Sequence, residues 1–306
     1  MTQIEITFLG TTAGVPTKSR NHASVAIKYR SEQEYVCLFD CGEGTQRQIL
    51  STDINFMRID DIFITHWHAD HFIGIVGMME TMNLEGRKKP LNIYGPEARR
   101  FVDVIEELGY GSKKYEIVAH DAWFEGATPQ ILLDMDEFQI ISIPVKHSIP
   151  AVAYAIVEKD RIKIDKVKAK DAGLPDKGPI FREIKENGFI MFRGKKIRLE
   201  DISMTEKGKR VSYSGDTMPC KNMVTISEGA DILIHDSTFF ENEADEGNYR
   251  HSNFDEVIGI AKRAGAKQLI LTHISRRYQN TDELLEKVKG YEGVKIAKDF
   301  MKIAID

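Results

Sequence analysis

The sequence has 306 residues, of which 42% are hydrophobic and 29% charged, a composition that is typical of a globular protein and excludes a fibrous or disordered chain. It holds no apolar run near the roughly 20 residues that a membrane span needs, and no basic-then-apolar signal at its start, so we expect a cytoplasmic protein. The three cysteines, Cys37, Cys41 and Cys220, form neither an even set nor a C-x-x-C pair, which argues against a disulfide framework and a cysteine-based zinc site.

Seven short segments have the apolar pattern of β-strands, and each is followed at once by a turn or a polar cluster. These segments are Ile4–Leu9, Val36–Asp40, Ile62–His66, Phe138–His147, Val211–Asp216, Ile232–Asp236 and Leu269–His273. Most of them run into a His or an Asp. Because rigid strands often carry ligands at their ends while loops close over them, the pattern predicts a site at the edge of a sheet.

Two further segments have helical patterns, Glu97–Leu108 and Phe254–Ala264. We expect Ser252 and Asp255 to form a capping box at the start of the second helix, and Gly265 to end it.

The stretch from about residue 158 to residue 200 differs from its surroundings because it is rich in Lys, Asp, Gly and Pro, and we interpret it as an insertion between two strands. It contains two basic blocks, Arg161–Lys170 and Arg193–Arg198. The whole chain has a formal net charge of -5, which is unusual for a protein that binds nucleic acid. On charge alone, the basic blocks are therefore interpreted as a solvated face.

The most informative motif is Thr65–His71, THWHADH, which follows an apolar, β-prone stretch. Residues two apart in an extended segment project to the same side, so His66 and His68 can bind one ion. Asp70 and His71 lie further round the turn, where they can face a second ion. A lone His is more often a hydrogen-bonded structural residue than a ligand, but three His and one Asp within six positions strongly indicate a metal site.

Further ligands are predicted at the ends of other strands: His147 in PVKHSIP, Asp216 in YSGDT and His273 in LTHIS. Together with THWHADH, they give two ions three ligands each, with Asp216 placed to bridge them and positions left open for a water or hydroxide. Imidazole nitrogen and carboxylate oxygen suit Zn²⁺, so we expect two Zn²⁺ ions per chain, with Mn²⁺ or Fe²⁺ as alternatives.

Four histidines lie outside this set. His22 and His120 have no partner that the sequence identifies, and we interpret both as structural. His235 opens HDST at a strand end, and His251 lies in RHSN before the second expected helix. From the residues alone, either one serves the local turn or takes part in catalysis.

Two motifs of other enzyme classes are absent or incomplete. The sequence has no G-x-S-x-G nucleophile elbow, and Ser237 is merely adjacent in sequence to His235 and Asp236, which the geometry of a catalytic triad does not require. Residues 42–44, GEG, lack the third glycine of a dinucleotide loop, because Arg47 occupies that place. These patterns argue against serine-hydrolase and nucleotide-cofactor chemistry.

The metal-binding residues together resemble the pattern of the metallo-β-lactamase superfamily, which implies an α/β fold of two sheets between helices, an αββα sandwich. Five segments further resemble the ribonuclease Z family. They are Phe8–Asn21, Leu38–Ile49, Pro144–Ala151, Val211–Cys220 and Leu271–Tyr278. This resemblance implies one domain over residues 1–306, with residues 158–200 as an inserted flexible arm.

Two loops carry the implied proton chemistry. HDST, residues 235–238, resembles the family's H-E-A-T loop, and RHSN, residues 250–253, resembles its H-S-T loop. The resemblance implies that His251 is the proton donor and that Asp236, which stands where the family has Glu, orients it. Asn253 replaces a Thr of the family pattern. Asp70 is implied to orient or deprotonate the attacking water as well as to bind metal.

The segment Val167–Phe181 is similar to the Gly and Pro motif of the arm by which these enzymes grip the tRNA elbow, with Lys177 as an extra residue. The basic blocks then fall within the arm, so a mostly acidic body can still present a cationic clamp. The substrate-binding residues that the resemblance implies are Lys18, Arg20, Arg277, Lys168, Lys170, Gly178 and Pro179.

The resemblance implies a zinc-dependent endoribonuclease that removes the 3′ trailer from precursor tRNA and leaves a tRNA 3′-hydroxyl and a 5′-phosphorylated trailer. It also implies a homodimer whose partner is precursor tRNA. Two other interpretations stay open. A superfamily hydrolase of small phosphodiesters or thioesters would not need the arm, and a catalytically silent RNA-binding module should lack some of the metal ligands.

Overall fold

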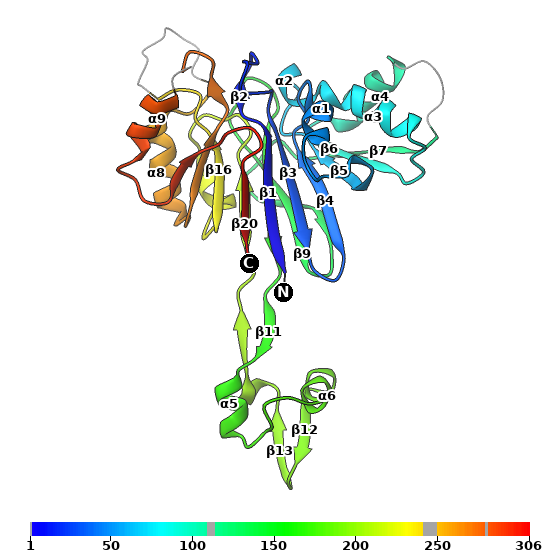
Figure 1. The fold of residues 1–306 in the computed structure, drawn as a ribbon, viewed down its shortest axis with the longest axis vertical. Coiled ribbons are helices and arrows are strands. Elements are labelled where there is room, and N and C mark those ends of the chain that lie inside the picture. Colours follow the sequence, from blue (N-terminus) through cyan, green and yellow to red (C-terminus); the bar gives the residue numbers. More distant parts are fainter. Residues whose placement is uncertain (1, 109–113, 241–249, 279–280) are drawn as a thin grey trace. The chain divides into compact units, whose positions relative to one another are not determined.

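The structure is a computed structural model that describes residues 2–108, 114–240, 250–278 and 281–306. The chain divides into two compact units (Figure 1). Unit 1 comprises Met1–Val157 and Arg210–Asp306, and unit 2 is Glu158–Lys209.

Unit 1 contains two seven-stranded sheets. The first has the strand order β20-β1-β3-β4-β5-β6-β7. Its strands are β1 (Gln3–Gly10), β3 (Ser24–Arg30), β4 (Glu34–Phe39), β5 (Ile59–Phe63), β6 (Leu91–Gly95), β7 (Ile117–Asp121) and β20 (Lys302–Ile305). The pairs from β4 to β7 are parallel, and the pairs from β20 to β4 are antiparallel.

The second sheet has the order β19-β17-β16-β15-β10-β9-β8. Its strands are β8 (Gln130–Asp134), β9 (Phe138–Pro144), β10 (Val152–Glu158), β15 (Arg210–Tyr213), β16 (Ile232–Asp236), β17 (Leu269–Thr272) and β19 (Val294–Ile296). The pairs from β15 to β19 are parallel. The short strands β2 (Thr12–Ala13) and β18 (Ile274–Ser275) pair with each other outside both sheets.

Successive side chains of a strand point to opposite faces of its sheet, so unit 1 has one apolar layer between its two sheets and one on the outer face of each sheet. Ile232 and Ile234 of β16 lie in a core that also contains residues of the first sheet, such as Ile4 and Ile6, so this core lies between the two sheets. Leu233, which points to the opposite face, packs instead in a cluster with residues of the C-terminal helices. The first sheet packs its outer face against helices in the same way. The expected αββα sandwich is therefore confirmed.

The helices of unit 1 cover the outer faces of the two sheets (Figure 1). They are α1 (Thr45–Leu50), α2 (Ala69–Phe72), α3 (Gly74–Leu84), α4 (Ala98–Glu107), α7 (Lys221–Ile226), α8 (Phe254–Ala264) and α9 (Thr281–Val288), with a 3-10 turn at Phe56–Arg58. Among the described residues, no helix is both long enough and apolar enough to cross a membrane.

The start of α8 differs from the prediction. Its capping box is formed by Asn253 and Glu256, one position after the expected pair Ser252 and Asp255. The Ser252 hydroxyl instead donates to the carbonyl of Thr217, 2.7 Å away. That contact spans 35 positions of sequence and could not be read from local spacing. Gly265 ends the helix with a positive φ of 65°, as predicted.

The parallel strands decide where the site forms. Because β4 and β5 run parallel, as do β15, β16 and β17, the carboxyl ends within each set meet at one edge of their sheet. The residues that follow these strands include all the expected ligands except His147, which follows β9.

Unit 2 has a small fold of its own. Its elements are β11 (Arg161–Ile164), α5 (Lys166–Asp171), α6 (Ile180–Asn187), β12 (Phe189–Phe192), β13 (Lys195–Arg198), a 3-10 turn at Glu200–Ile202 and β14 (Ser203–Glu206). Its core consists of Ala169, Leu174, Ile184, Ile190, Ile197 and Ile202. The insertion was expected to end at about residue 200, whereas the unit ends at Lys209, because β14 returns as the antiparallel partner of β11.

Candidate active site

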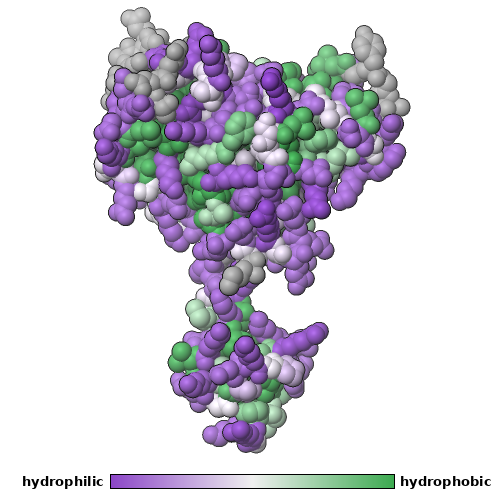
Figure 2. All heavy atoms as spheres, in the orientation of Figure 1, coloured by the Kyte–Doolittle hydropathy of each residue, from purple (hydrophilic) through white to green (hydrophobic). Residues whose placement is uncertain are grey.

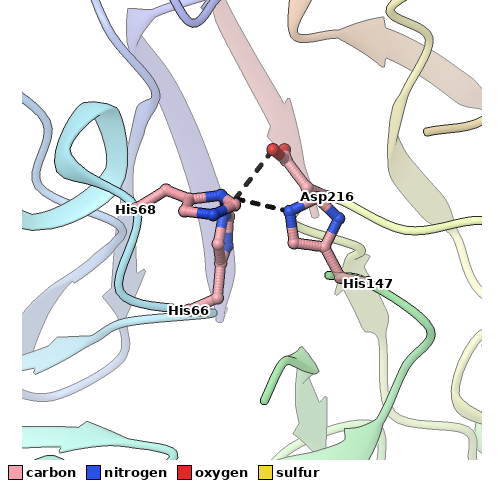
Figure 3. Close-up of side chains that lie close together, drawn as sticks. All are labelled: His66, His68, His147 and Asp216. Carbon is pink, nitrogen blue, oxygen red and sulfur yellow. Dashed lines mark hydrogen bonds and ion pairs between the residues drawn. The ribbon is translucent and has the colours of Figure 1, made fainter. Parts of the chain in front are cut away.

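One cluster of candidate ligands joins the two sheets of unit 1. His66 and His68 follow β5, and His147 and Asp216 follow β9 and β15 (Figure 3). Nδ1 of His68 lies 3.1 Å from Nε2 of His66 and 3.2 Å from Nε2 of His147, and Nε2 of His66 lies 3.6 Å from Oδ2 of Asp216. Ligand atoms about 2.0–2.1 Å from a tetrahedral ion are about 3.3 Å apart. The spacing therefore fits a single bound ion.

A second cluster lies on the other side of Asp216. Its nitrogens are Nε2 of His71, on α2, and Nε2 of His273, which are 3.3 Å apart. Each is also 3.3 Å from Oδ1 of Asp216. Oδ2 of Asp70 lies 3.6 Å from Nε2 of His71 and 3.5 Å from Nε2 of His273. These four side chains offer a second set of ligands at the same spacing.

Asp216 is shared by the two clusters, with one oxygen toward each. The side chain is 3% exposed, and its Oδ1 accepts no hydrogen bond from the described residues. A buried carboxylate oxygen without a donor is costly unless a cation lies next to it. The donor set and this oxygen therefore fit two divalent ions with Asp216 between them.

Backbone geometry at Gly215 brings Asp216 close to the loop after β5. Gly215 has a φ of 56°, and a Cβ atom there would lie 2.6 Å from Cβ of Thr65. Only glycine allows both the left-handed conformation and this close approach. His273 adopts a φ of 56° without being glycine, a strained conformation of the kind that is found at functional sites.

The pKa values in the first cluster favour neutral imidazoles. Burial, together with the neighbouring histidines, holds the pKa of His66 well below its ordinary value. Burial likewise lowers the pKa of His68 and His147. Nδ1 of His147 donates to the carbonyl of Arg250, 2.9 Å away, which leaves its Nε2 unprotonated and directed at the cluster. Neutral imidazole is the form that binds metal.

The histidines of the second cluster are surrounded by more carboxylates, which raise their pKa values. Burial alone would lower the pKa of His273, but Asp216, Asp236 and Asp70 together raise it to about 10. His71 is buried as well, and Asp216 and Asp40 raise its pKa well above the ordinary value. These carboxylates stabilise positive charge at this position, whether a proton or a metal ion supplies it.

His251 and Asp236 form a pair beside the shared carboxylate. Nδ1 of His251 lies 3.0 Å from Oδ2 of Asp236. Asp236 is fully buried, and although burial alone would raise its pKa, His251 holds that pKa well below the usual range. Burial likewise opposes charge on His251, but Asp236 raises the pKa of His251 above its ordinary value. Since Nδ1 is engaged, Nε2 is the nitrogen of His251 that is available for proton transfer.

Asp40 is a site residue that the sequence analysis did not single out. It follows β4 with a φ of 58°, is fully buried, and its Oδ2 accepts hydrogen bonds from Nδ1 of His71 at 2.7 Å and from the Tyr213 hydroxyl at 2.8 Å. The available signal was an Asp at the end of a predicted strand, the same signal that marked Asp216.

The remaining histidines serve local structure. His22 contacts the carbonyl of Gly14 at 3.1 Å, and Nε2 of His120 lies 3.1 Å from Oδ1 of Asn92. His235, for which two roles were open, is buried and its Nδ1 contacts the backbone carbonyl of Asp236 at 2.8 Å. It therefore supports its own turn, whereas His251 lies within the site.

The expected substrate-binding residues fall into two groups. Lys18 and Arg20 line a cavity of unit 1 with Arg276 and Tyr278, but Nη1 of Arg20 is already engaged by the Thr11 hydroxyl at 2.6 Å and the carbonyl of Ala297 at 2.7 Å. Arg277 is exposed and lies over the Phe239 ring.

The second group belongs to unit 2. Nζ of Lys168 donates to the carbonyl of Ser203 at 3.1 Å, and Lys170 lines the cavity between α5 and α6. Gly178 has a φ of 147°, and Pro179 is the N-cap residue of α6.

Comparison with known proteins identifies the family. A family model described as Anti-Pycsar protein Apyc1 matches residues 4–107, and one described as Beta-lactamase superfamily domain matches residues 201–274. Ribonuclease Z of Methanosarcina acetivorans is 38% identical, covering 99% of this chain and 98% of the relative. Ribonuclease Z of Methanothermobacter thermautotrophicus is also 38% identical, over 99% of this chain and 97% of the relative. The chain belongs to the ribonuclease Z family.

A solved structure agrees with this ribonuclease Z assignment. The short form of human tRNase Z superposes with a TM-score of 0.70 and 28% identity, over 99% of both chains. The predicted family and the predicted fold class are confirmed. As a member of the ribonuclease Z family, the chain is a metal-dependent hydrolytic endoribonuclease of the metallo-β-lactamase superfamily.

Proposed function

We propose that this ribonuclease Z family member cleaves the 3′ trailer from precursor tRNA and uses two bound Zn²⁺ ions to do so. The products would be a tRNA with a 3′-hydroxyl and a trailer with a 5′-phosphate. The observation that carries the proposal is the position of Asp216, which has one oxygen in each of two ligand clusters and lies beside the His251–Asp236 pair.

Two divalent ions held by the seven proposed ligands would lower the pKa of a water and polarise the scissile phosphodiester. The ligands are His66, His68, Asp70, His71, His147, Asp216 and His273. Asp70 has a second role in the proposal, which is to orient or deprotonate the attacking water. Burial would raise the pKa of Asp70, but His273 and His71 hold it well below its ordinary value, so the side chain is ionised. Oδ2 of Asp70 is itself positioned by the backbone N–H of Gly14, 3.0 Å away.

His251 supplies the second proton transfer. As the water oxygen bonds to phosphorus, the bond from phosphorus to the 3′ oxygen of the tRNA breaks, and Nε2 of His251 donates a proton to that leaving oxygen. Asp236 fixes the ring through Nδ1 and stabilises its protonated form.

Charge distribution supports unit 2 as the tRNA-binding arm. Residues 158–209 contain 15 Lys and Arg against 10 Asp and Glu, a formal charge of +5, whereas the whole chain has -5. The face of unit 2 in Figure 2 is largely hydrophilic, with apolar side chains between. Its cavity between α5 and α6 is lined by five cationic side chains, Lys166, Lys170, Lys177, Arg182 and Lys185, and by two acidic ones, Asp176 and Glu186, of which Glu186 pairs with Arg182 at 2.8 Å. A cationic surface of this kind suits the sequence-independent recognition of an RNA backbone.

Cleavage of a precursor tRNA with a 5′-labelled transcript tests the proposal. We expect one cut at the 3′ side of the acceptor stem, a product 3′ end that is oxidised by periodate, and a trailer that can be ligated through its 5′-phosphate. Loss of activity with a chelator should be reversed by Zn²⁺. Hydrolysis of small phosphodiesters without cleavage of precursor tRNA would favour the small-molecule hydrolase instead.

We further propose that the enzyme is cytoplasmic and, on the strength of the family resemblance, acts as a homodimer. Light scattering on the purified chain, with its mass of 34.8 kDa, tests the dimer directly. A mass near one chain at the concentration of the activity assay would exclude it.

A further inference from the structure

Two threonines, Thr65 and Thr238, have the same relationship to two different buried aspartates. The backbone N–H of Thr65 donates to Oδ1 of Asp40 at 2.8 Å, and its hydroxyl lies 3.0 Å from the same oxygen. The backbone N–H of Thr238 donates to Oδ1 of Asp236 at 2.9 Å, and its hydroxyl lies 2.6 Å from that oxygen. All four side chains are buried.

Each threonine hydroxyl also contacts a candidate metal ligand. Oγ1 of Thr65 lies 3.0 Å from Nδ1 of His66, and Oγ1 of Thr238 lies 2.9 Å from Nδ1 of His273. The corresponding direct contact, from Nδ1 of His273 to Oδ1 of Asp236, is 3.7 Å, which is too long for a hydrogen bond. The hydroxyl therefore stands between carboxylate and imidazole.

The chemistry of the groups fixes the direction of these hydrogen bonds. A hydroxyl has one proton, and an ionised carboxylate can only accept. The proton of each threonine therefore points to its aspartate, and the threonine oxygen accepts from Nδ1–H of the histidine. In the neutral, metal-binding ring this leaves Nε2 unprotonated, toward Asp216, at 3.6 Å for His66 and 3.3 Å for His273.

The opposite arrangement is incompatible with metal binding. If the hydroxyl donated to Nδ1, the neutral ring would carry its proton on Nε2, the atom that faces the ligand cluster. The carboxylate oxygen would also lose its hydroxyl donor.

The second carboxylate oxygen of each aspartate accepts a hydrogen bond directly from another histidine. Oδ2 of Asp40 lies 2.7 Å from Nδ1 of His71, and Oδ2 of Asp236 lies 3.0 Å from Nδ1 of His251. Each aspartate thus orients two rings, one directly and one through a threonine.

We infer that Thr65 and Thr238 are positioning residues, and that they set the tautomer and orientation of His66 and His273 respectively. Each threonine hydroxyl donates its proton to a buried aspartate and can therefore only accept a hydrogen bond from Nδ1–H of its histidine. The inference rests on the proposed two-ion centre. Because His66 belongs to the first ligand cluster and His273 to the second, the two threonines support different ions.

Substitution of each threonine by valine tests this inference, because valine has the shape of threonine without the hydroxyl. Metal-free wild type, Thr65→Val and Thr238→Val would be titrated with Co²⁺, and binding followed by the visible absorption bands of the bound ion. We expect wild type to bind two equivalents, and each variant to bind one of them roughly 10- to 100-fold more weakly, the usual effect of removing a hydrogen-bond partner of a metal-binding histidine. The bands that weaken should differ between the two variants.

Serine variants and an unrelated threonine supply the controls. Thr65→Ser and Thr238→Ser keep the hydroxyl and should restore both equivalents. Thr45→Val removes another buried hydroxyl, which donates to the carbonyl of Gly42, and should bind Co²⁺ as wild type does. Thermal unfolding of the metal-free proteins shows whether each variant folds, and an alanine variant replaces a valine variant that does not.

Three results would overturn the inference. Valine variants that bind both equivalents of Co²⁺ as wild type does would exclude the proposed role of the threonines but not the two-ion centre. Serine variants as weak as the valine variants would show that shape, and not the hydroxyl, matters. Wild type that binds one equivalent would remove the two-ion centre and the inference with it.

Discussion

Nδ1 of His251 lies 3.0 Å from Oδ2 of Asp236, and this contact determines which nitrogen of His251 can act in the site. The side chain of Asp236 is one methylene shorter than the Glu that the family pattern has at this position. The shorter side chain of Asp236 still contacts the imidazole ring of His251. Asp236 is the last residue of β16, and His251, which lies just before α8, is placed next to it.

Replacing His251 by Ala should leave both metal ions bound and the affinity for precursor tRNA nearly unchanged. Turnover should fall roughly 10²-fold or more, the scale expected when a proton donor is lost. Metal content by mass spectrometry, tRNA binding by filter retention and single-turnover cleavage measure the three quantities.

A substrate with a good leaving group separates the possible roles of His251. A nitrophenyl phosphodiester needs no protonation of its leaving oxygen, so His251→Ala should be much less impaired on it. An equally large defect on this substrate would assign His251 to metal or phosphate positioning instead.

The alkaline side of the pH–rate profile should depend on Asp236. A general acid works while it is protonated, so activity is present below the pKa of His251 and is lost as the pH rises through it. Because Asp236 raises the pKa of His251, Asp236→Asn should lower that pKa and move the alkaline loss of turnover to lower pH.

The control for the pH experiment is Asp255→Asn. Asp255 is an exposed residue in the first turn of α8, so its removal changes the net charge equally without touching the ring. An alkaline limb that moves equally in both variants, or in neither, would contradict the assignment of His251 and Asp236.

Replacing Asp216 by Ala should reduce metal content at both positions, because each ligand cluster loses one carboxylate oxygen. His68→Ala is the contrasting variant, since His68 belongs only to the first cluster, and it should retain the second ion. Metal analysis that finds one ion per chain in active wild-type enzyme would exclude a bridging Asp216.

Removing unit 2 should weaken precursor tRNA binding without destroying the catalytic centre. Val157 and Arg210 are directly paired across β10 and β15, so a two-residue Asn-Gly turn can replace residues 158–209. Binding should become less dependent on salt, because log affinity falls with log salt by about 0.9 per neutralised phosphate. Hydrolysis of a small phosphodiester should survive, and equal loss on both substrates would mean that the segment supports the core.

A milder variant changes only charge. Lys166, Lys170 and Lys177 replaced together by Gln should reduce the salt dependence of tRNA binding, whereas the same change at Lys88, Lys221 and Lys262 of unit 1 should affect it less. A similar change in the two variants would argue against unit 2 as the principal RNA contact.

The sequence alone was sufficient for the fold class, the family and the proposed ligand set. Apolar alternation predicted the strands, and His or Asp at the strand ends predicted a site at a sheet edge, because both are properties of segments a few residues long. The local helix stop at Gly265 was predicted for the same reason.

The contacts between residues far apart in the chain become visible in the folded structure alone. Asp40 contacts His71 and Tyr213 across 31 and 173 positions, and Ser252 leaves the expected capping box for a carbonyl 35 positions away. The end of unit 2 at Lys209 depends on the pairing of β14 with β11. Such contacts depend on how the parallel strands of two sheets bring their ends together, and the spacing of residues within a segment does not specify that arrangement.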